Sequence, residues 1–380
     1  MTVVQVLPAL DSGGVERGTL EVAQALVRAG HRSIVISAGG RLVPTLTAAG
    51  SEHLSWPLGV KSPWTLRWIP RLRRLLERER VDILHARSRM PAWVAYLAWR
   101  GMTAPGRAHL VTTVHGLYSV NRYSAVMTRG ERVIAVSEAA RDYLLRYYPE
   151  LPQERVLVIP RGVDRAEFPY GYRPPEPWLQ VWRREYPQLH DQRVLTLPGR
   201  LTRLKGHGDF VELIGRLRHR GLPVHGIIVG GAGSRGWRYR NELIRARDAM
   251  GLQDAITLLD HRADVREIYA VSDLVLSLSW QPESFGRTVL EALSIGVPVV
   301  GYDHGGVGEI LGRVFPAGRV PARDLPALEA RVEALLREPV AVPETHPFTL
   351  QQMLQDTLDL YWRLAGDISG AGPASVPRRP

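Results

Sequence analysis

Residues 280–298 read Trp-Gln-Pro-Glu-Ser-Phe-Gly-Arg-Thr-Val-Leu-Glu-Ala-Leu-Ser-Ile-Gly-Val-Pro. They follow an apolar run, residues 273–279, that is typical of a buried parallel strand. Pro282 and Gly286 break the chain, and residues 288–295 are then predicted to form a short helix that ends before a glycine. The stretch therefore predicts a strand, a loop and a helix, which is the repeating unit of an α/β protein.

Two carboxylates, Glu283 and Glu291, lie eight residues apart in this stretch. The backbone N–H groups around residues 285–288 should face outward at the positive end of the helix, which favours a phosphate. The two carboxylates can accept hydrogen bonds from hydroxyls on either side. A sugar nucleotide offers sugar hydroxyls, a diphosphate and a ribose diol in that order. The plain alternative is an ordinary strand–loop–helix unit in which both glutamates are solvated.

The stretch from Pro282 to residue 300 resembles the E-x7-E signature of the retaining glycosyltransferases of family 4. The resemblance, which runs from residue 3 to residue 364, implies an α/β protein of the GT-B fold. That fold has two facing Rossmann-like domains with parallel sheets and a C-terminal helix that crosses back to the first domain. It implies that Glu283 contacts the donor sugar and Glu291 the ribose. The donor-binding residues implied between them are Phe285, Gly286, Arg287 and Thr288.

Composition limits the class of protein. The chain has 380 residues, of which 45% are hydrophobic and 23% charged, so it is long enough for two ordinary globular domains. No apolar run approaches the ~18 residues of a membrane span, and no signal peptide is apparent. The absence of cysteine excludes disulfides, thiolate nucleophiles and Cys-ligated zinc. We expect a cytoplasmic enzyme.

Charge is distributed unevenly. Residues 1–168 hold 23 Arg and Lys against 14 Asp and Glu, whereas residues 169–380 hold 26 against 24. A basic first half favours an anionic partner, such as a lipid surface, a nucleic acid or a phosphorylated acceptor. No recognised nucleic-acid-binding module is present, so we expect no nucleic-acid partner.

The chain opens as a nucleotide-binding α/β domain does. Residues 3–7 are predicted to form a strand, and residues 11–18 a loop that leads into a helix. Gly13 and Gly14 in that loop would let a donor phosphate or sugar approach the backbone closely. A tight turn between strand and helix explains the same pair.

Residues 62–80 carry apolar side chains at helical spacing, with arginines on much of the other face. Pro70 is expected to kink or restart this helix. Aromatic residues beside arginines favour a helix that lies on an anionic bilayer, here the cytoplasmic face of an inner membrane. The alternative is a core-packed helix with a solvated basic face.

Arg87 and Arg89 follow the predicted strand 81–85, and Arg122 follows the strand 110–114. These segments are similar to a bacterial branch of the family that is linked to lipopolysaccharide-core assembly. The resemblance implies that the three arginines bind a phosphorylated or acidic glycolipid acceptor. It also implies that His115, directly after its strand, contacts the donor sugar near the reacting carbon. A lone histidine is more often a packed core residue.

Arg200 and Lys205 lie between glycines after the predicted strand 193–198. The resemblance assigns this pair to the donor diphosphate. No Asp-x-Asp occurs in the sequence, so we expect no metal and no other cofactor. Two cations and a helix N-terminus must then stabilise the departing diphosphate. The predicted catalytic residues are therefore His115, Arg200, Lys205 and Glu283.

Residues 231–236 match the G-x-G-x-x-G fingerprint of nicotinamide-cofactor domains. Asp260 follows Gly231 by 29 positions rather than the ~20 of that fingerprint, and the motif lies in the middle of the chain. Relatives carry a glycine turn here close to the nucleotide. The resemblance therefore makes Gly231 a donor-binding residue and disfavours hydride transfer.

The predicted acceptor domain comprises residues 1–168 with 347–366, and the predicted donor domain residues 193–346. Residues 169–192 are predicted to be a linker, and residues 367–380 a disordered tail. The expected reaction moves a sugar from a nucleotide-sugar donor to a glycolipid or oligosaccharide acceptor with retained configuration. The alternatives are a sugar-nucleotide 2-epimerase of the same fold and a non-catalytic glycan- or lipid-binding protein.

Overall fold

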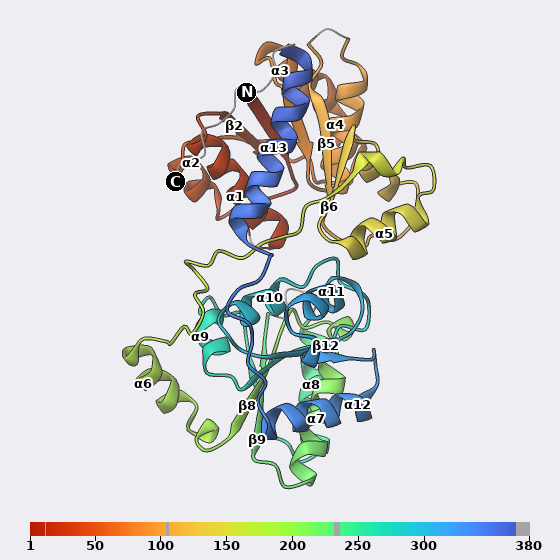
Figure 1. Ribbon diagram of the computed structural model, residues 1–380. Coiled ribbons are helices and arrows are strands. Elements are labelled where there is room, and N and C mark those ends of the chain that lie inside the picture. Colours follow the sequence, from red (N-terminus) through yellow and green to blue (C-terminus); the bar gives the residue numbers. More distant parts are fainter. Residues whose placement is uncertain (12, 104–105, 232–235, 370–380) are drawn as a thin grey trace. The chain divides into compact units, whose positions relative to one another are not determined.

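The structure is a computed structural model, and it describes residues 1–11, 13–103, 106–231 and 236–369. The chain forms two compact units. The first comprises Met1–Pro160 and the chain from Gln351 onward, and the second comprises Arg161–Leu350. Both are shown in Figure 1.

The first unit is built on a parallel sheet in the order β3-β2-β1-β4-β5-β6-β7. The central strands are buried along almost their whole length, which explains their continuous apolar runs. The strands are β1 Thr2–Val6, β2 Arg32–Ser37, β3 Glu52–Ser55, β4 Ile83–Ala86, β5 His109–Val114, β6 Arg132–Ala135 and β7 Val156–Val158.

Helices connect these strands, and the local sequence explains several of their ends. The hydroxyl of Ser137 accepts a hydrogen bond from the N–H of Ala140 at 2.9 Å and so caps the first turn of α5. The helices are α1 Gly14–Arg28, α2 Val43–Ala48, η1 Pro63–Arg67, α3 Trp68–Arg78, α4 Arg89–Arg100, η2 Ser124–Thr128, α5 Glu138–Tyr147 and η3 Gln153–Arg155.

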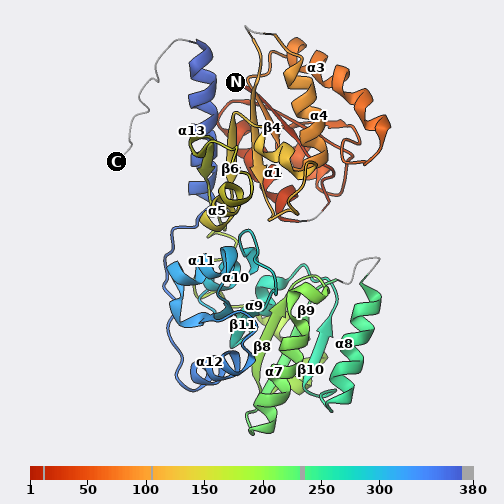
Figure 2. The same ribbon diagram turned by 90° about the vertical axis from the view of Figure 1, so that its right-hand side faces the viewer.

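The last helix, α13 (Leu350–Ser369), belongs to the first unit, and Figure 2 shows it beside that unit's sheet. Two polar contacts hold it there. The hydroxyl of Tyr361 lies 2.5 Å from Nδ1 of buried His85, and Trp362 Nε1 donates to Nε2 of His31 at 2.9 Å. The predicted helix that returns to the first domain is therefore present.

The second unit contains a parallel sheet in the order β10-β9-β8-β11-β12-β13. Its strands are β8 Arg193–Pro198, β9 Val224–Val229, β10 Ile256–Leu259, β11 Leu274–Ser277, β12 Val299–Tyr302 and β13 Arg319–Val320. Its helices are α6 Glu176–Glu185, η4 Pro187–Leu189, η5 Arg203–Lys205, α7 His207–His219, α8 Trp237–Ala249, α9 Val265–Ala270, α10 Arg287–Ser294, α11 Gly305–Val314, η6 Pro316–Gly318 and α12 Leu325–Arg337.

Both sheets reverse their strand order at one place, between β1 and β4 in the first unit and between β8 and β11 in the second. Open α/β sheets bind ligands beyond the carboxyl ends of the strands at this switch point. The predicted pair of Rossmann-like parallel-sheet domains is confirmed.

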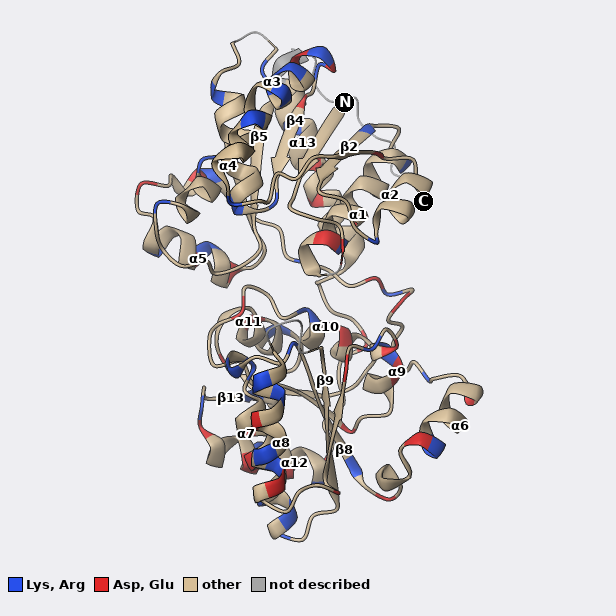
Figure 3. Cartoon of the chain, turned by 180° about the vertical axis from the view of Figure 1, so that it is seen from behind, with Lys and Arg blue, Asp and Glu red and all other residues tan. Residues whose placement is uncertain are grey.

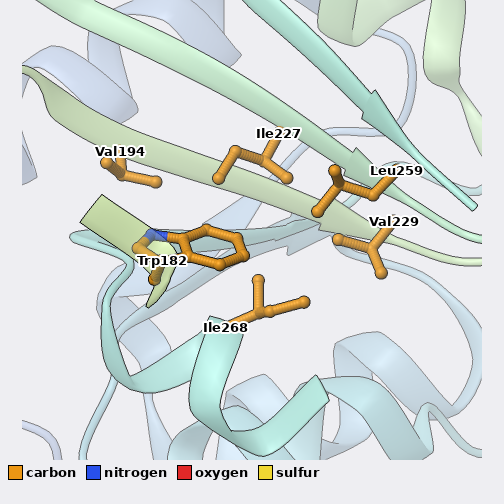
Figure 4. Packing of buried hydrophobic residues seen from close by; sticks show 6 residues of the cluster. All are labelled: Trp182, Val194, Ile227, Val229, Leu259 and Ile268. Atoms are coloured by element: carbon orange, nitrogen blue, oxygen red, sulfur yellow. The ribbon is translucent and has the colours of Figure 1, made fainter. Parts of the chain in front are cut away.

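The predicted linker, residues 169–192, is wrong, because this segment folds as part of the second unit. Trp182 of α6 is buried against β8, β9, β10 and α9, as Figure 4 shows; the cluster consists of Trp182, Val194, Ile227, Val229, Leu259 and Ile268. Trp178 packs beside it, and its Nε1 donates to Asp264 at 2.8 Å. The prolines of this segment indicated a linker, but burial of its large aromatic side chains stabilises the segment against the second unit.

The unit boundaries also differ from the predicted ones. The first unit ends at Pro160 rather than at residue 168, and the chain returns to it at residue 351 rather than 347. Of the predicted tail, residues 367–369 belong to α13, and residues 370–380 lie outside the described part of the chain.

The predicted helix over residues 62–80 begins as the 3-10 turn η1 and becomes α3 at Trp68. Pro70 lies in the first turn of α3, where backbone N–H groups have no acceptor within the helix. The proline therefore costs no helical hydrogen bond. The apolar face, Trp68, Leu72, Leu75 and Leu76, is buried, as the core-packed alternative requires, whereas Trp64 is 77% exposed. None of the helices in the described ranges is long and apolar enough to cross a bilayer.

Candidate active site

An ion pair occupies the switch point of the second unit. Lys205 closes η5 in the connection after β8, and Glu283 lies in the loop after β11. The Lys205 Nζ donates to Glu283 Oε1 at 2.7 Å, and both side chains are a little more than a quarter exposed. The two residues that the sequence placed at the donor diphosphate and the donor sugar are therefore in direct contact.

Glu283 is held ionised by its neighbours. Burial raises the pKa of its carboxyl, but the charge and hydrogen bond of Lys205 and the hydroxyl of Ser279 outweigh that effect, so the pKa lies below its ordinary value. Nε2 of His304 lies 2.8 Å from the carbonyl oxygen of Ser279 and so fixes the same loop. The second carboxylate oxygen, Oε2, is thus the one available to a hydroxyl.

Gly305 and Gly306 serve the fold of this loop. The N–H of Gly306 donates to the carbonyl of Glu283 at 2.7 Å. A Cβ on Gly306 would lie 2.3 Å from backbone atoms of Phe285, and one on Gly305 would lie 2.6 Å from the Glu283 carbonyl. The structure shows that the first turn of α11 packs against the loop backbone.

The start of α10 presents its predicted residues in different environments. Gly286 is the N-cap with a left-handed φ of 115°, and Thr288 is half-buried. Phe285 is buried and its ring packs edge-on against Phe348, so its side chain belongs to the core. Only its backbone remains a candidate for donor contact.

Glu291 is not the solvated helix charge of the plain alternative, because only 7% of it is exposed. Its Oε1 accepts a hydrogen bond from Arg287 Nε at 2.9 Å, one helical turn earlier. Arg287 itself is half-buried. These two predicted donor-binding residues therefore form a pair at the helix start.

The other predicted residues of the second unit lie near strand ends. Arg200 is exposed two residues after β8, and Gly231 is half-buried two residues after β9. Gly233 of the glycine fingerprint lies outside the described residues. Within the described ranges, no group of three or more His, Asp or Glu side chains is arranged to hold a metal ion.

Three predicted residues lie at the carboxyl edge of the first sheet. Gly13 is the N-cap of α1 with a φ of 146°, and Gly14 is its first residue, with open space where a Cβ would stand. His115 directly follows β5 and is half-buried. Open α/β sheets bind ligands at this edge, and the roles of the three residues stay predictions.

Arg87 directly follows β4 but points into the interior. It is 4% exposed, its Nη1 donates to Gln5 at 2.7 Å, and burial lowers the pKa of its guanidinium. The structure gives this residue a structural contact at the first switch point. Its predicted acceptor contact therefore lacks an accessible side chain.

Arg89 and Arg122 differ from Arg87 in exposure. Arg122 is exposed, and Arg89, the first residue of α4, lies half-buried over the rings of Tyr118 and Tyr123 at 4.5 and 5.3 Å. These are the two predicted acceptor-binding arginines that a ligand can reach.

Sequence reasoning missed Lys61 at this place. Its Nζ lies 5.2 Å from the centre of the Tyr123 ring, so Lys61 and Arg89 approach the same ring. Neither cation pairs with a carboxylate within the described part of the chain. Two uncompensated cations on one ring favour an anion, and the scarcity of lysine, two in the chain, was a usable signal.

Both halves of the chain are similar to known glycosyltransferases. Residues 12–167 match the family model described as Glycosyltransferase Family 4, and residues 180–346 match the model described as Glycosyl transferases group 1. A glycosyltransferase from Rickettsia africae has a TM-score of 0.83 and 29% identity, over 96% of this chain and 98% of that one. The chain has the GT-B fold, and each half of it matches a glycosyltransferase model.

Two further solved structures show the same fold. HepE of Anabaena, in complex with UDP and glucose, has a TM-score of 0.74 and 19% identity over 97% of both chains. WaaG, a glycosyltransferase involved in lipopolysaccharide biosynthesis, has a TM-score of 0.66 and 17% identity over 97% of this chain and 100% of that one.

The chain matches only part of its curated relatives. One subunit of the human phosphatidylinositol N-acetylglucosaminyltransferase is 28% identical over 79% of this chain and 61% of the relative. The D-inositol 3-phosphate glycosyltransferase of Gordonia bronchialis is 28% identical over 60% of this chain and 52% of the relative. The matched region thus spans about half to three fifths of these two relatives.

Proposed function

We propose that this protein transfers a sugar from a nucleotide-sugar donor to a glycolipid or oligosaccharide acceptor, with retained configuration. The observation that carries the proposal is the Lys205–Glu283 pair at the switch point of the second unit. It joins a cation for a diphosphate to an ionised carboxylate for a sugar hydroxyl. The UDP and glucose held by the HepE structure are the ligand chemistry that such a pair fits.

The donor diphosphate would lie between Lys205, exposed Arg200 and the N-terminus of α10. Lys205 has three N–H donors, so it can keep its bond to Glu283 while it binds phosphate. Contacts of this charge-assisted kind contribute about 1.5–3 kcal/mol each. Together they stabilise the leaving diphosphate, and we propose that they do so without a metal ion.

The proposed step breaks the bond between the anomeric carbon and the diphosphate oxygen, and the acceptor oxygen bonds to that carbon from the same face. The acceptor proton passes to the leaving diphosphate. Glu283 orients the donor sugar through a hydroxyl, and Glu291 would accept from the ribose. His115 is proposed to contact the donor sugar.

The acceptor is proposed to carry a phosphate or another oxyanion, bound by Arg89 and Lys61 above Tyr123. Arg122 is exposed nearby in sequence and can add a third charge. The relative named as an inositol 3-phosphate glycosyltransferase and WaaG, named for lipopolysaccharide biosynthesis, fit an acidic or glycolipid acceptor. We propose a role in cell-envelope glycan synthesis at the cytoplasmic face of the inner membrane.

A peripheral contact with anionic lipid would use the outer side of η1 and α3. Trp64 is exposed there, and exposed arginines follow it, Arg67 at the end of η1 and Arg71, Arg74 and Arg78 on α3, where basic residues are blue in Figure 3. Replacing Trp64 by Ala should weaken co-sedimentation with phosphatidylglycerol vesicles. The matched control is Trp237→Ala, which removes an exposed tryptophan of the second unit. Equal binding by both variants and the wild type would refute this surface as the anchor.

The function is tested by thermal-shift screening with UDP-, GDP- and ADP-sugars. A donor at ~100 times its dissociation constant adds about 2.7 kcal/mol of stability. The stabilising donor is then offered with phosphorylated and unphosphorylated sugar acceptors, and the products are analysed with and without acceptor. A transferred sugar supports the proposal, and a 2-epimerised donor formed without acceptor would indicate the epimerase alternative. If no sugar nucleotide stabilises the protein, the proposal is refuted.

A further inference from the structure

Asp209 connects the segments that carry the Lys205–Glu283 pair. Its Oδ2 accepts one hydrogen bond from Trp280 Nε1 at 2.8 Å and a second from the hydroxyl of Tyr302 at 2.5 Å. Asp209 lies in the first turn of α7, whereas Trp280 and Tyr302 lie after β11 and at the end of β12. One oxygen atom thus joins three separate segments at the carboxyl edge of the sheet.

Each of these segments leads directly to the ion pair. Asp209 is four residues after Lys205, and Trp280 is three residues before Glu283. The backbone repeats the connection, since the N–H of Trp280 donates to the carbonyl of Leu204 at 2.8 Å. The indole bond and the backbone bond therefore both join the segment of Lys205 to the segment of Glu283.

The third segment acts on the same loop from the other side. Two residues after Tyr302, His304 lies 2.8 Å from the carbonyl of Ser279, whose hydroxyl donates to Glu283. Arg323 lies over the Trp280 ring at 4.8 Å and covers the indole. The Tyr302 hydroxyl keeps its proton, because burial and the neighbouring Asp209 carboxylate raise its pKa far above the ordinary value.

We propose that Asp209 is a positioning residue for glycosyl transfer, which sets the separation of Lys205 and Glu283 through Trp280 and Tyr302. The inference rests on the proposed function. Asp209 makes these contacts through side chains and need not touch the donor. Misplacement of a catalytic group by about 1 Å costs on the order of 100-fold in rate.

The test compares Asp209→Asn with Asp209→Ala in the full-length protein. Both bonds end on one oxygen, so the carbonyl of Asn can accept both, whereas Ala accepts neither. We expect kcat to fall about 100-fold in Asp209→Ala while the donor KM changes little, and Asp209→Asn to recover most of the loss. Trp280→Phe and Tyr302→Phe, which each remove one bond, should lower kcat about tenfold.

The control is Asp273→Ala. Asp273 also joins two segments, because it accepts from the N–H of Val194 at 2.7 Å and from Arg193 at 2.9 Å, but it does so at the amino end of β11. Its loss should lower the urea midpoint with kcat unchanged. A kcat for Asp273→Ala as low as that of Asp209→Ala would reduce the effect to general loss of stability and overturn the proposal.

Two readouts separate positioning from the proposed function itself. Combining Asp209→Ala with Glu283→Gln should lower kcat little beyond Glu283→Gln alone, because both act through one geometry. The indole N–H resonance of Trp280, identified by its absence in Trp280→Phe, should shift in Asp209→Ala and stay in place in Asp209→Asn. A shifted resonance with unchanged kcat, or additive losses in the double variant, would overturn the proposal. A wild type that binds no sugar nucleotide would instead refute the function.

Discussion

The two sheets share one strand order but fill their switch points in opposite ways. In the second unit, Lys205 and Glu283 are partly exposed and form an ion pair. In the first, Arg87 is buried, donates to the amide of Gln5 and is attracted by the charge of Glu21. A partly exposed ion pair can share its charges with a ligand, whereas a fully buried charge is held in place by the fold. The comparison favours the second unit for the proposed chemistry.

Gly14 differs from Gly305 and Gly306 in the same sense. A Cβ on Gly305 or Gly306 would clash with the backbone of the loop at 283–285, so the fold requires glycine at both positions. Gly14 has open space where a Cβ would stand, so packing does not require it. A glycine that the fold does not need is the better candidate for close approach by a ligand.

The largest effect is expected when the second switch point loses its cation. Lys205→Gln removes the charge from both Glu283 and the diphosphate, and we expect kcat to fall about 100-fold with the preferred donor. Steady-state kinetics measures it. Arg203→Gln is the matched control, since Arg203 is exposed two residues earlier and pairs with Glu242. Comparable turnover in Lys205→Gln and Arg203→Gln would remove Lys205 from the proposed machinery.

Gly306→Ala should break the loop contact of the second unit. The added Cβ would meet backbone atoms of Phe285 at 2.3 Å, and we expect a loss of about 1–3 kcal/mol in unfolding free energy. Urea unfolding measures this. Gly312→Ala, in the same helix with its nearest neighbour at 3.6 Å, should not destabilise. An unaffected Gly306→Ala would show that α11 can retreat from the loop without cost.

Arg87→Met tests the first switch point. The Gln5 oxygen loses its donor, so stability should fall by about 1–2 kcal/mol, while Arg87→Met with Gln5→Leu should recover at least half of that. Both forms should use acceptors as well as the wild type does. If acceptor KM rises sharply with stability preserved, Arg87 binds acceptor as the sequence indicates, and the contrast between the two switch points fails.

The loss of turnover at low pH should depend directly on the Lys205–Glu283 ion pair. The pKa of Glu283 lies below the ordinary 4.5, because Lys205 and Ser279 outweigh burial. The midpoint of the loss of turnover that needs ionised Glu283 is then expected below pH 4.5. In Lys205→Gln, burial still raises the pKa of Glu283 but the charge of Lys205 no longer lowers it. The loss of turnover should therefore begin at a higher pH. A loss of turnover at the same pH in both proteins would contradict the assignment to Glu283.

Gly14→Ala is expected to change stability least. An Ala at the first position of α1 meets no atom within 4 Å and should stabilise the helix by up to about 0.5–1 kcal/mol. A rise in donor or acceptor KM would then show that a ligand approaches this backbone. Unchanged kinetic constants would leave Gly14 a plain turn residue.

Much of the fold and of the candidate site follows from local sequence. Apolar runs predicted the central strands, and the positions of Glu283 and Glu291 relative to the predicted helix placed one in the loop and one in α10. The i,i+4 spacing of Arg287 and Glu291 also allows their pair to be read from the sequence.

The remainder depends on contacts between distant segments. Asp209 meets Trp280 only because α7 and β11 are neighbours in space, and no local pattern marks that contact. Burial of Arg87 likewise follows from its position between strands, whereas its residue type predicts exposure. The prediction for residues 169–192 failed for a related reason. It rested on the proline content, whereas the burial of Trp182 depends on residues that are distant in the sequence.

The division of the chain has a consequence for synthesis. The second unit is continuous, Arg161–Leu350, whereas the first needs α13, which is translated after it. The second unit can therefore complete its fold on the ribosome while the first still waits for Tyr361 and Trp362 to reach their histidines. A nascent or truncated chain that stops near residue 350 leaves His85 without its tyrosine, and a chaperone would meet that uncovered surface first.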